Sequence, residues 1–211
     1  MKKILNVFIL IALLSGTVSA QKSETEITGN QLDVLVKKIS TTHQQLKTLS
    51  AEFVQEKASS LFTEKVVQKG KFYYQAPKQL RWEYSSPQKL CLLFNDKKVS
   101  IVTEKGVVNN PNPMLNELGA TIIGTINGSN LCDQKNFKGS FYKNGKSNYT
   151  AVLIPTNKKM KGNYKKIHVL IDGKSYLAKQ VTLYEQSGDI TTISFSHVTS
   201  NATLPNNLFT K

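Results

Sequence analysis

The side chains best suited to chemistry lie in one segment, GKFYYQAPKQLRWEYSSP, which runs from Gly70 to Pro87. It has the pattern of two strands interrupted at Pro77, because proline donates no backbone hydrogen bond. Alternate positions carry large apolar side chains, which therefore share one face of a sheet. These side chains are Phe72, Tyr74, Leu80, Trp82 and Tyr84. Their chemistry would be noncovalent binding of an apolar ligand, although on periodicity alone such a face is more often ordinary core.

Motifs for covalent or metal-assisted catalysis are missing from the sequence. It contains no G-x-S-x-G nucleophile elbow, no H-E-x-x-H, no paired-cysteine metal motif and no phosphate-binding glycine loop. His43 falls at the edge of the apolar stripe of a predicted helix. We expect a hydrogen-bonded boundary histidine there, because no partner lies at metal-ligand spacing. The sequence therefore predicts a protein that is not an enzyme and that needs no cofactor or metal.

Two cysteines, Cys91 and Cys132, are the only ones in the chain. In an oxidising compartment they could form a disulfide, which would stabilise the fold by roughly 4 kcal/mol in the entropic model. Cys91 also lies inside the apolar run LCLLF, where a free thiol packs as a small hydrophobe. Both alternatives remain open on the sequence.

The first 20 residues have the three parts of a secretory signal peptide. Two lysines precede an apolar run from Ile4 to Leu14, and a small-residue cleavage motif ends at Ala20. The apolar run is too short to span a bilayer. No cysteine follows the cleavage motif, so we expect an exported, soluble, unacylated protein that begins near Gln21. Residues 21–211 are then one domain with a sizeable core.

The start of this domain combines a polar arm with a helix. Residues 21–28 are polar and predict a flexible arm. Helical spacing of apolar residues predicts an amphipathic helix from Gln31 to Leu49, capped by Asn30. Its buried stripe would consist of Leu32, Leu35, Val36, Ile39, Leu46 and Leu49.

From Ala51 onward the apolar period changes to two. Turn-forming pairs such as Asn-Gly, Asp-Gly and Ser-Gly separate many of the strands that this period predicts. The ten predicted strands are Ala51–Lys57, Glu64–Gln75, Gln79–Tyr84, Lys89–Phe94, Lys98–Thr103, Gly139–Lys143, Tyr149–Pro155, Tyr164–Asp172, Ala178–Tyr184 and Ile190–His197. One antiparallel meander of this size tends to curl into a barrel or half-barrel.

One segment interrupts the strands with a helix pattern. Pro113 suits the first turn of a helix, which then ends before Gly128. The apolar residues at helical spacing are Met114, Leu115, Leu118, Ile122, Ile123 and Ile126. So apolar a helix must cover something apolar. It is either a permanent plug of the barrel end or a lid over a cavity, and the sequence alone favours the plug.

The charge of the chain is strongly basic and unevenly spread. Lys and Arg number 28 against 14 acidic residues, and loss of the two leader lysines leaves a net charge of +12. Nine lysines and no acid lie between Asp133 and Asp172. Such a surface attracts anions, which in a bacterial envelope are lipid headgroups or acidic proteins. Nucleic acid is a poor fit, because no RNA-binding aromatic signature or helix-turn-helix pattern accompanies the lysines.

The ordered set of these motifs resembles one protein family. The glycine, alternating aromatics, proline, Leu-Arg-Trp-Glu-Tyr run and second proline of residues 70–87 are similar to the periplasmic outer-membrane lipoprotein carriers, the LolA family. The likeness extends to Phe53-Val54-Gln55 after the helix, the YEQSGD hairpin at 184–189, the TTISF strand at 191–195, and Leu204-Pro205 with Phe209. It covers nearly the whole mature chain.

The resemblance implies a mainly β fold with a helical lid (α+β). A single antiparallel curved sheet would form an incomplete β-barrel, covered by the N-terminal amphipathic helix and the mid-chain apolar helix. The implied lipid-binding cavity consists of Phe53, Phe72, Tyr74, Leu80, Trp82, Tyr84, Leu92 and Phe94. The implied lid consists of Met114, Leu115, Leu118, Ile122, Ile123 and Ile126.

The resemblance also implies a function in the periplasm. The protein would be a monomeric lipoprotein chaperone that receives acylated lipoproteins from an inner-membrane exporter and carries them to the outer membrane. An outer-membrane acceptor or an anionic membrane surface would receive the cargo. Two alternatives remain: a lipid-binding or lipid-sensing module without delivery, and a periplasmic hydrolase whose catalytic residues meet only in space.

One residue departs from the family pattern. The enterobacterial carrier has an arginine immediately before the proline, proposed to latch the lid, where this chain has Ala76. Arg81 is nearby in sequence but falls on the strand face opposite Trp82. The latch therefore does not carry over to this chain.

Overall fold

The computed structural model describes residues 25–59, 61, 63–95, 98–109, 113–126, 128, 131, 133 and 135–210. Within these ranges the side chains of residues 109, 113–118, 120 and 159 are not described. The predicted signal peptide, residues 1–20, and Cys132 lie outside the described residues. Of the helices in the described ranges, none has the length and apolar character needed to cross a membrane.

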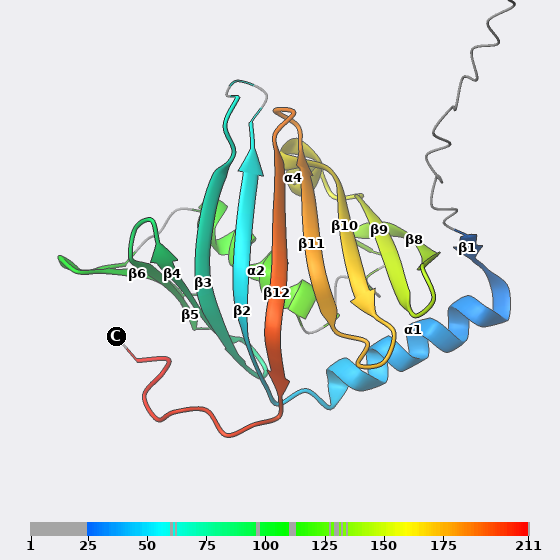
Figure 1. Ribbon diagram of the computed structural model, residues 1–211, viewed down its shortest axis with the longest axis horizontal. Coiled ribbons are helices and arrows are strands. Elements are labelled where there is room, and N and C mark those ends of the chain that lie inside the picture. The colour runs from blue at the N-terminus through cyan, green and yellow to red at the C-terminus, as the bar shows by residue number, and fades with distance from the viewer. Residues whose placement is uncertain are drawn as a thin grey trace, which may run out of the picture.

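The described residues form a single antiparallel sheet of 12 strands, which Figure 1 shows with helices against it. Its strands are β1 (Thr25–Ile27), β2 (Thr48–Ala58), β3 (Val66–Gln75), β4 (Gln79–Ser86), β5 (Leu90–Asn95), β6 (Lys98–Thr103), β7 (Gly106–Asn109), β8 (Phe137–Asn144), β9 (Asn148–Pro155), β10 (Tyr164–Asp172), β11 (Ala178–Glu185) and β12 (Ile190–Ser200). Their order in space is β1-β8-β9-β10-β11-β12-β2-β3-β4-β5-β6-β7. The edges β1 and β7 do not pair, so the sheet is an incomplete barrel, as the sequence predicted.

The strand order corrects the prediction of one continuous meander. All ten predicted strands are present, but β7 and β8 occupy regions far apart in the sheet, and α2 (Pro113–Ile126) runs behind the sheet between them (Figure 1). Two meanders result, and β12 joins them by pairing with β2, with Phe195 opposite Phe53. Strand β1 replaces part of the predicted flexible arm, because it pairs with β8 and buries Ile27. Strand β7 was not predicted.

Two helices cover one face of the sheet, as predicted. Helix α1 (Gly29–Gln44) packs Leu35 and Ile39 against the half of the sheet that begins at β8. Helix α2 packs Ile126 against the half that begins at β2, and Pro113 is its first residue, as the sequence indicated. A third helix, α4 (Lys158–Asn163), was not predicted, although the Asn157 side chain caps it by accepting a hydrogen bond from the Met160 N–H at 2.8 Å.

Helix α1 ends earlier than predicted, at Gln44 instead of Leu49. The reason is a distant residue, Asn201, whose side chain accepts a hydrogen bond from the Lys47 N–H at 2.8 Å and donates one to the Gln45 carbonyl at 3.2 Å. These bonds use backbone groups that a longer helix would need. Leu49 consequently lies on β2. Asn30 also lies inside the helix instead of capping it, because the helix begins at Gly29.

The apolar core consists of two clusters. The first is built mainly from β2 to β6 and includes seven of the eight side chains predicted to line a cavity. The second is built from α1, β1 and β8 to β11. Phe195 of β12 packs against both clusters, so the boundary between them lies along this strand.

Candidate functional site

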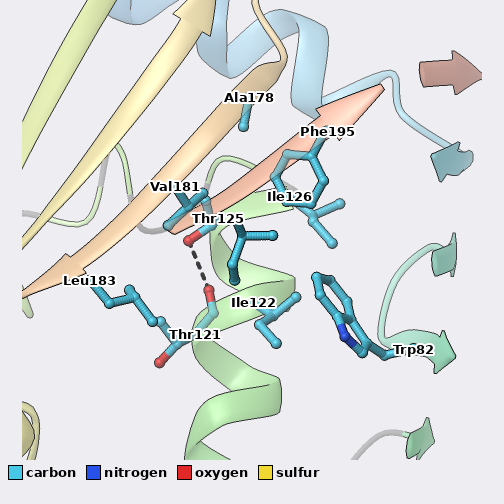
Figure 2. A pocket seen from close by; sticks show the side chains of 10 residues that line it. Trp82, Thr121, Ile122, Thr125, Ile126, Ala178, Val181, Leu183 and Phe195 are labelled. Carbon is cyan, nitrogen blue, oxygen red and sulfur yellow. Dashed lines mark hydrogen bonds between the residues drawn. The ribbon is translucent and has the colours of Figure 1, made fainter. Parts of the chain in front are cut away.

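An apolar cavity lies where the two core clusters meet, beneath α2. Figure 2 shows its side chains, which come from α2, β4, β11 and β12 together with Ala178 at the start of β11. The residues that line it are Trp82, Thr121, Ile122, Thr125, Ile126, Ala178, Val181, Leu183, Ile193 and Phe195. The empty space among them, including the part open to solvent, measures about 390 Å³. The cavity volume that compares with that of small-molecule sites is only about 30 Å³, far below their ~300–1,000 Å³.

Helix α2 supplies the cover of this cavity through one of its faces. The cavity-lining residues of α2 form two pairs that are four positions apart, Thr121 with Thr125 and Ile122 with Ile126. Side chains at this spacing lie on the same side of a helix. The Thr125 hydroxyl donates to the Thr121 carbonyl at 2.9 Å, the bond drawn in Figure 2. This hydrogen bond within the helix satisfies the hydroxyl, so Thr125 can present its methyl group to the cavity.

The opposite wall is centred on Trp82. Its ring stacks on Phe53 at a centroid distance of 4.2 Å and on Phe72 at 5.6 Å. Phe195 approaches edge-on at 6.4 Å. The indole is 1% exposed and faces Ile122 and Ile126 of α2 in Figure 2. A rigid aromatic wall therefore faces a helix that covers it.

Of the eight side chains predicted to line a cavity, the structure places one in the cavity wall, Trp82. The others surround it in the first core cluster, with Tyr84 partly buried at the margin. Leu80, the position aligned with a cavity aromatic in the enterobacterial carrier, has no exposed surface. These seven side chains, Phe53, Phe72, Tyr74, Leu80, Tyr84, Leu92 and Phe94, support the wall instead of forming it.

Of the six predicted lid residues, Ile122 and Ile126 line the cavity and Ile123 packs against the first core cluster. The side chains of Met114, Leu115 and Leu118 lie outside the description. Sequence reasoning missed Val181, Leu183, Ile193 and Phe195. Their period-two spacing marks an inward face, but only the pairing of β12 with β2 brings that face beside Trp82.

Ala76 stands at the position of the latch arginine, and Arg81 lies on β4. Ala76 packs against the first core cluster. The Arg81 side chain forms an ion pair with Glu83 and donates from its Nη1 to the Leu208 carbonyl at 3.0 Å. Arg81 therefore holds the C-terminal segment of the chain.

Cys91, one of the two cysteines that could form a disulfide, is buried. Cys91 is a free thiol in the structure, 7% exposed. Burial raises the pKa of the Cys91 thiol to about 11, so it stays protonated at neutral pH and packs as an apolar group. Its potential partner Cys132 lies outside the described residues.

His43 differs from the prediction of a hydrogen-bonded boundary residue. The ring is 6% exposed, and neither nitrogen makes a hydrogen bond to any residue that the structure describes. Burial lowers the pKa of His43, although the backbone groups of Ile126 and Tyr176 lie near enough to oppose this shift in part. His43 is therefore a neutral packing residue. No group of three or more His, Cys, Asp or Glu side chains that could hold a metal ion occurs within the described ranges.

Two comparisons with known proteins found a matching family and similar folds. Residues 44–211 match the family described as "Outer membrane lipoprotein carrier protein LolA". The fold is similar to a LolA superfamily protein from Nitrosomonas europaea, at 9% identity, with 85% of this chain and 97% of that chain covered and a TM-score of 0.44. It is also similar to MucB, at 8% identity, 85% and 62% coverage and a TM-score of 0.52. A third similar structure is that of the MucA/MucB complex of Pseudomonas aeruginosa, at 10% identity and a TM-score of 0.50. The match covers 84% of this chain and 60% of that chain. A comparison with curated protein sequences found no match.

Proposed function

Because this chain belongs to the LolA family of outer membrane lipoprotein carrier proteins, we propose that it is a periplasmic chaperone for lipoproteins. It would hold the acyl chains of a lipoprotein in the cavity beneath α2 and carry them from the inner to the outer membrane. The observation that supports this proposal most is the cavity wall, which exposes only apolar atoms in the part that the structure describes. Its partners would be an inner-membrane exporter and an outer-membrane acceptor or anionic membrane surface.

An apolar wall suits a carrier because its affinity depends on the area buried. Each methylene removed from water contributes about 0.8 kcal/mol, and no fixed polar contact must be broken when the chain leaves. The cavity volume of about 30 Å³ is far below that of a ligand pocket, so a cargo with three acyl chains requires α2 to move away from the sheet. The role is binding without catalysis, and it requires no cofactor.

The first experiment tests lipid binding. The protein is expressed with its leader in a bacterium with an outer membrane, purified without detergent, and analysed by mass spectrometry for bound acyl lipids. Ala178 lines the cavity, so Ala178→Phe should fill it and reduce the bound lipid several-fold. The matched control is Ala202→Phe, since Ala202 is exposed outside the strands. Equal lipid content in both variants, or no lipid in the wild type, would contradict the proposed site.

The second experiment separates delivery from lipid binding alone. Depletion of the protein in its native host should shift acylated lipoproteins from the outer to the inner membrane, measured by proteomics of the separated membranes. An unchanged distribution together with lipid bound in the first experiment would favour the alternative, a lipid-binding or lipid-sensing module without delivery.

A further inference from the structure

One end of the sheet carries exposed apolar side chains at the tips of two neighbouring turns. These are the β2–β3 hairpin and the β11–β12 turn, which lie side by side because β2 pairs with β12 (Figure 1). Leu61 in the hairpin turn is 84% exposed, more than any other large apolar side chain in the described ranges. Val66 and Val67 at the start of β3 and Ile190 at the start of β12 are also exposed. We call these four side chains the apolar tip.

Hydrogen bonds connect the two turns to each other and to α4. The Ser59 hydroxyl in the hairpin donates to the Asp189 carboxylate in the β11–β12 turn at 3.1 Å. The Gln186 N–H of the same turn donates to the Asn163 carbonyl, at the end of α4, at 2.9 Å. The hairpin, the turn and α4 therefore form one connected surface.

Exposed lysines lie on the α4 side of this surface. Lys158 and Lys161 are exposed on α4, and Lys165 is exposed on β10. The start of β10 belongs to the same end of the sheet, because Tyr164 pairs with Glu185 at the end of β11. Apolar and cationic side chains consequently meet at one end of the molecule.

Ion pairs engage most of the acidic side chains at this end. The pairs are Lys57 with Glu185 and with Asp189, each at 3.1 Å, and Lys65 with Glu56 at 3.7 Å. Glu64 is also exposed in the hairpin, but the three exposed lysines on α4 and β10 outnumber it. The surface around the apolar tip therefore has an excess of positive charge.

We propose that this end of the molecule docks on an anionic bilayer, with Leu61 entering the acyl layer and the lysines of α4 contacting lipid phosphates. A bilayer presents negative charge above an apolar interior, which matches a projecting leucine beside a cluster of lysines. Exposed apolar patches with a polar rim mark interaction sites of this kind. The inference goes beyond the proposed function, because the apolar tip shares no residue with the cavity wall and docking requires no cargo.

The first experiment measures flotation of the cargo-free protein with phosphatidylglycerol vesicles. Leu61→Gln removes the most exposed apolar side chain without changing the net charge. We expect binding to weaken about tenfold, the order expected when one leucine no longer leaves water for an apolar layer. The matched control is Val34→Gln, since Val34 is 47% exposed on α1, which Figure 1 shows at the other end of the sheet. This control should bind as the wild type does, and equal binding by Leu61→Gln would overturn the insertion.

Salt separates the apolar contact from attraction between charges. At about 1 M salt the screening length falls to about 3 Å, so exposed lysines contribute little. The wild type should keep part of its binding under these conditions, and Leu61→Gln should keep none. Complete loss in the wild type would show that only charge holds the protein on the vesicle, and would contradict the entry of Leu61 into the bilayer.

A tryptophan reporter tests the depth of insertion directly. Trp82 is the only tryptophan in the chain, so Leu61→Trp in a Trp82→Phe background carries a single reporter. Lipids with brominated acyl chains should quench its fluorescence, and they should not quench Val34→Trp in the same background. Binding without quenching at residue 61 would place this residue outside the acyl layer and refute the proposal.

The flotation experiment also decides between a membrane and a protein partner. A folded wild type that does not bind these vesicles would overturn membrane docking and leave an acidic protein as the partner of the lysines. That result would not touch the proposed function, which depends on lipid bound in the cavity and is tested by the lipid content of the purified protein.

Discussion

Gly119 of α2 lies directly on the ring of Phe94: a Cβ atom at Gly119 would be 2.1 Å from Phe94 Cε1. Phe94 is 3% exposed within the first core cluster, so its ring has little freedom to move aside. The helix therefore approaches the sheet this closely only because residue 119 has no side chain.

This contact distinguishes a lid from a permanent plug. Gly119→Ala should displace α2, and if α2 is a lid the displacement exposes Trp82, which acrylamide quenching of its fluorescence will report. In the plug interpretation the same substitution overpacks the core, lowering stability by about 1–3 kcal/mol while Trp82 stays inaccessible. Gly162→Ala is the matched control, since Gly162 lies in α4 with no atom within 4 Å of its added Cβ.

A substitution at Leu80 tests whether this residue belongs to the core that supports the cavity or to the cavity wall. Because Leu80 has no exposed surface and lies outside the cavity wall, Leu80→Glu places an unpaired carboxylate in true core. We expect a loss of at least about 3 kcal/mol of unfolding free energy, measured by urea denaturation. Val66→Glu is the control, because Val66 is 57% exposed on β3. A stable Leu80→Glu variant would show that ligand or water reaches this position.

Burial of His43 should make the free energy of unfolding depend on pH. Since its folded pKa lies below the unfolded value of about 6.5, the unfolded state binds the proton more readily. The stability due to neutral His43 is complete above pH 6.5 and is lost as the pH falls from there through the folded pKa. His43→Gln should therefore flatten the decline in unfolding free energy between about pH 6.5 and 5. Thr41→Gln, at an exposed position of the same helix, changes no titratable group and should retain the wild-type slope.

The lysine-rich run predicts salt-sensitive membrane docking. Lys158 and Lys161 are exposed on α4, and α4 lies near the β11–β12 turn, whose Gln186 side chain donates to the Lys161 carbonyl at 2.8 Å. Binding to vesicles containing phosphatidylglycerol should weaken as salt rises, because exposed charges are screened beyond about 8 Å at physiological salt. Reversal of Lys158, Lys159 and Lys161 to Glu should abolish it.

The control reverses three exposed lysines outside the run, Lys37, Lys98 and Lys105, which changes the net charge by the same amount. If both triple variants lose binding equally, total charge explains the attraction and the run has no special role. Binding that ignores both salt and charge reversal would remove the electrostatic explanation altogether.

The sequence by itself determined the elements whose signals are local. Period-two spacing located ten of the strands, and Pro113 marked the start of an apolar helix between them. The aromatic segment around Trp82, in its order with the other motifs, identified the family. Each of these signals depends on residues a few positions apart, and the backbone geometry of a strand or a helix relates such neighbours directly.

Only the tertiary structure decided which surfaces meet. The pairing of β12 with β2 joins residues far apart in the chain, and it turns Val181, Ile193 and Phe195 into the wall opposite α2. Asn201 ends α1 from the far end of the chain, and the same folding buries His43 with no hydrogen-bond partner among the described residues. Strand pairing and side-chain burial depend on how distant segments pack together, and local periodicity does not encode that arrangement. For this reason the cavity wall shares only Trp82 with the eight side chains that the sequence predicted to line a lipid site, and whether the other seven contact a ligand stays a prediction.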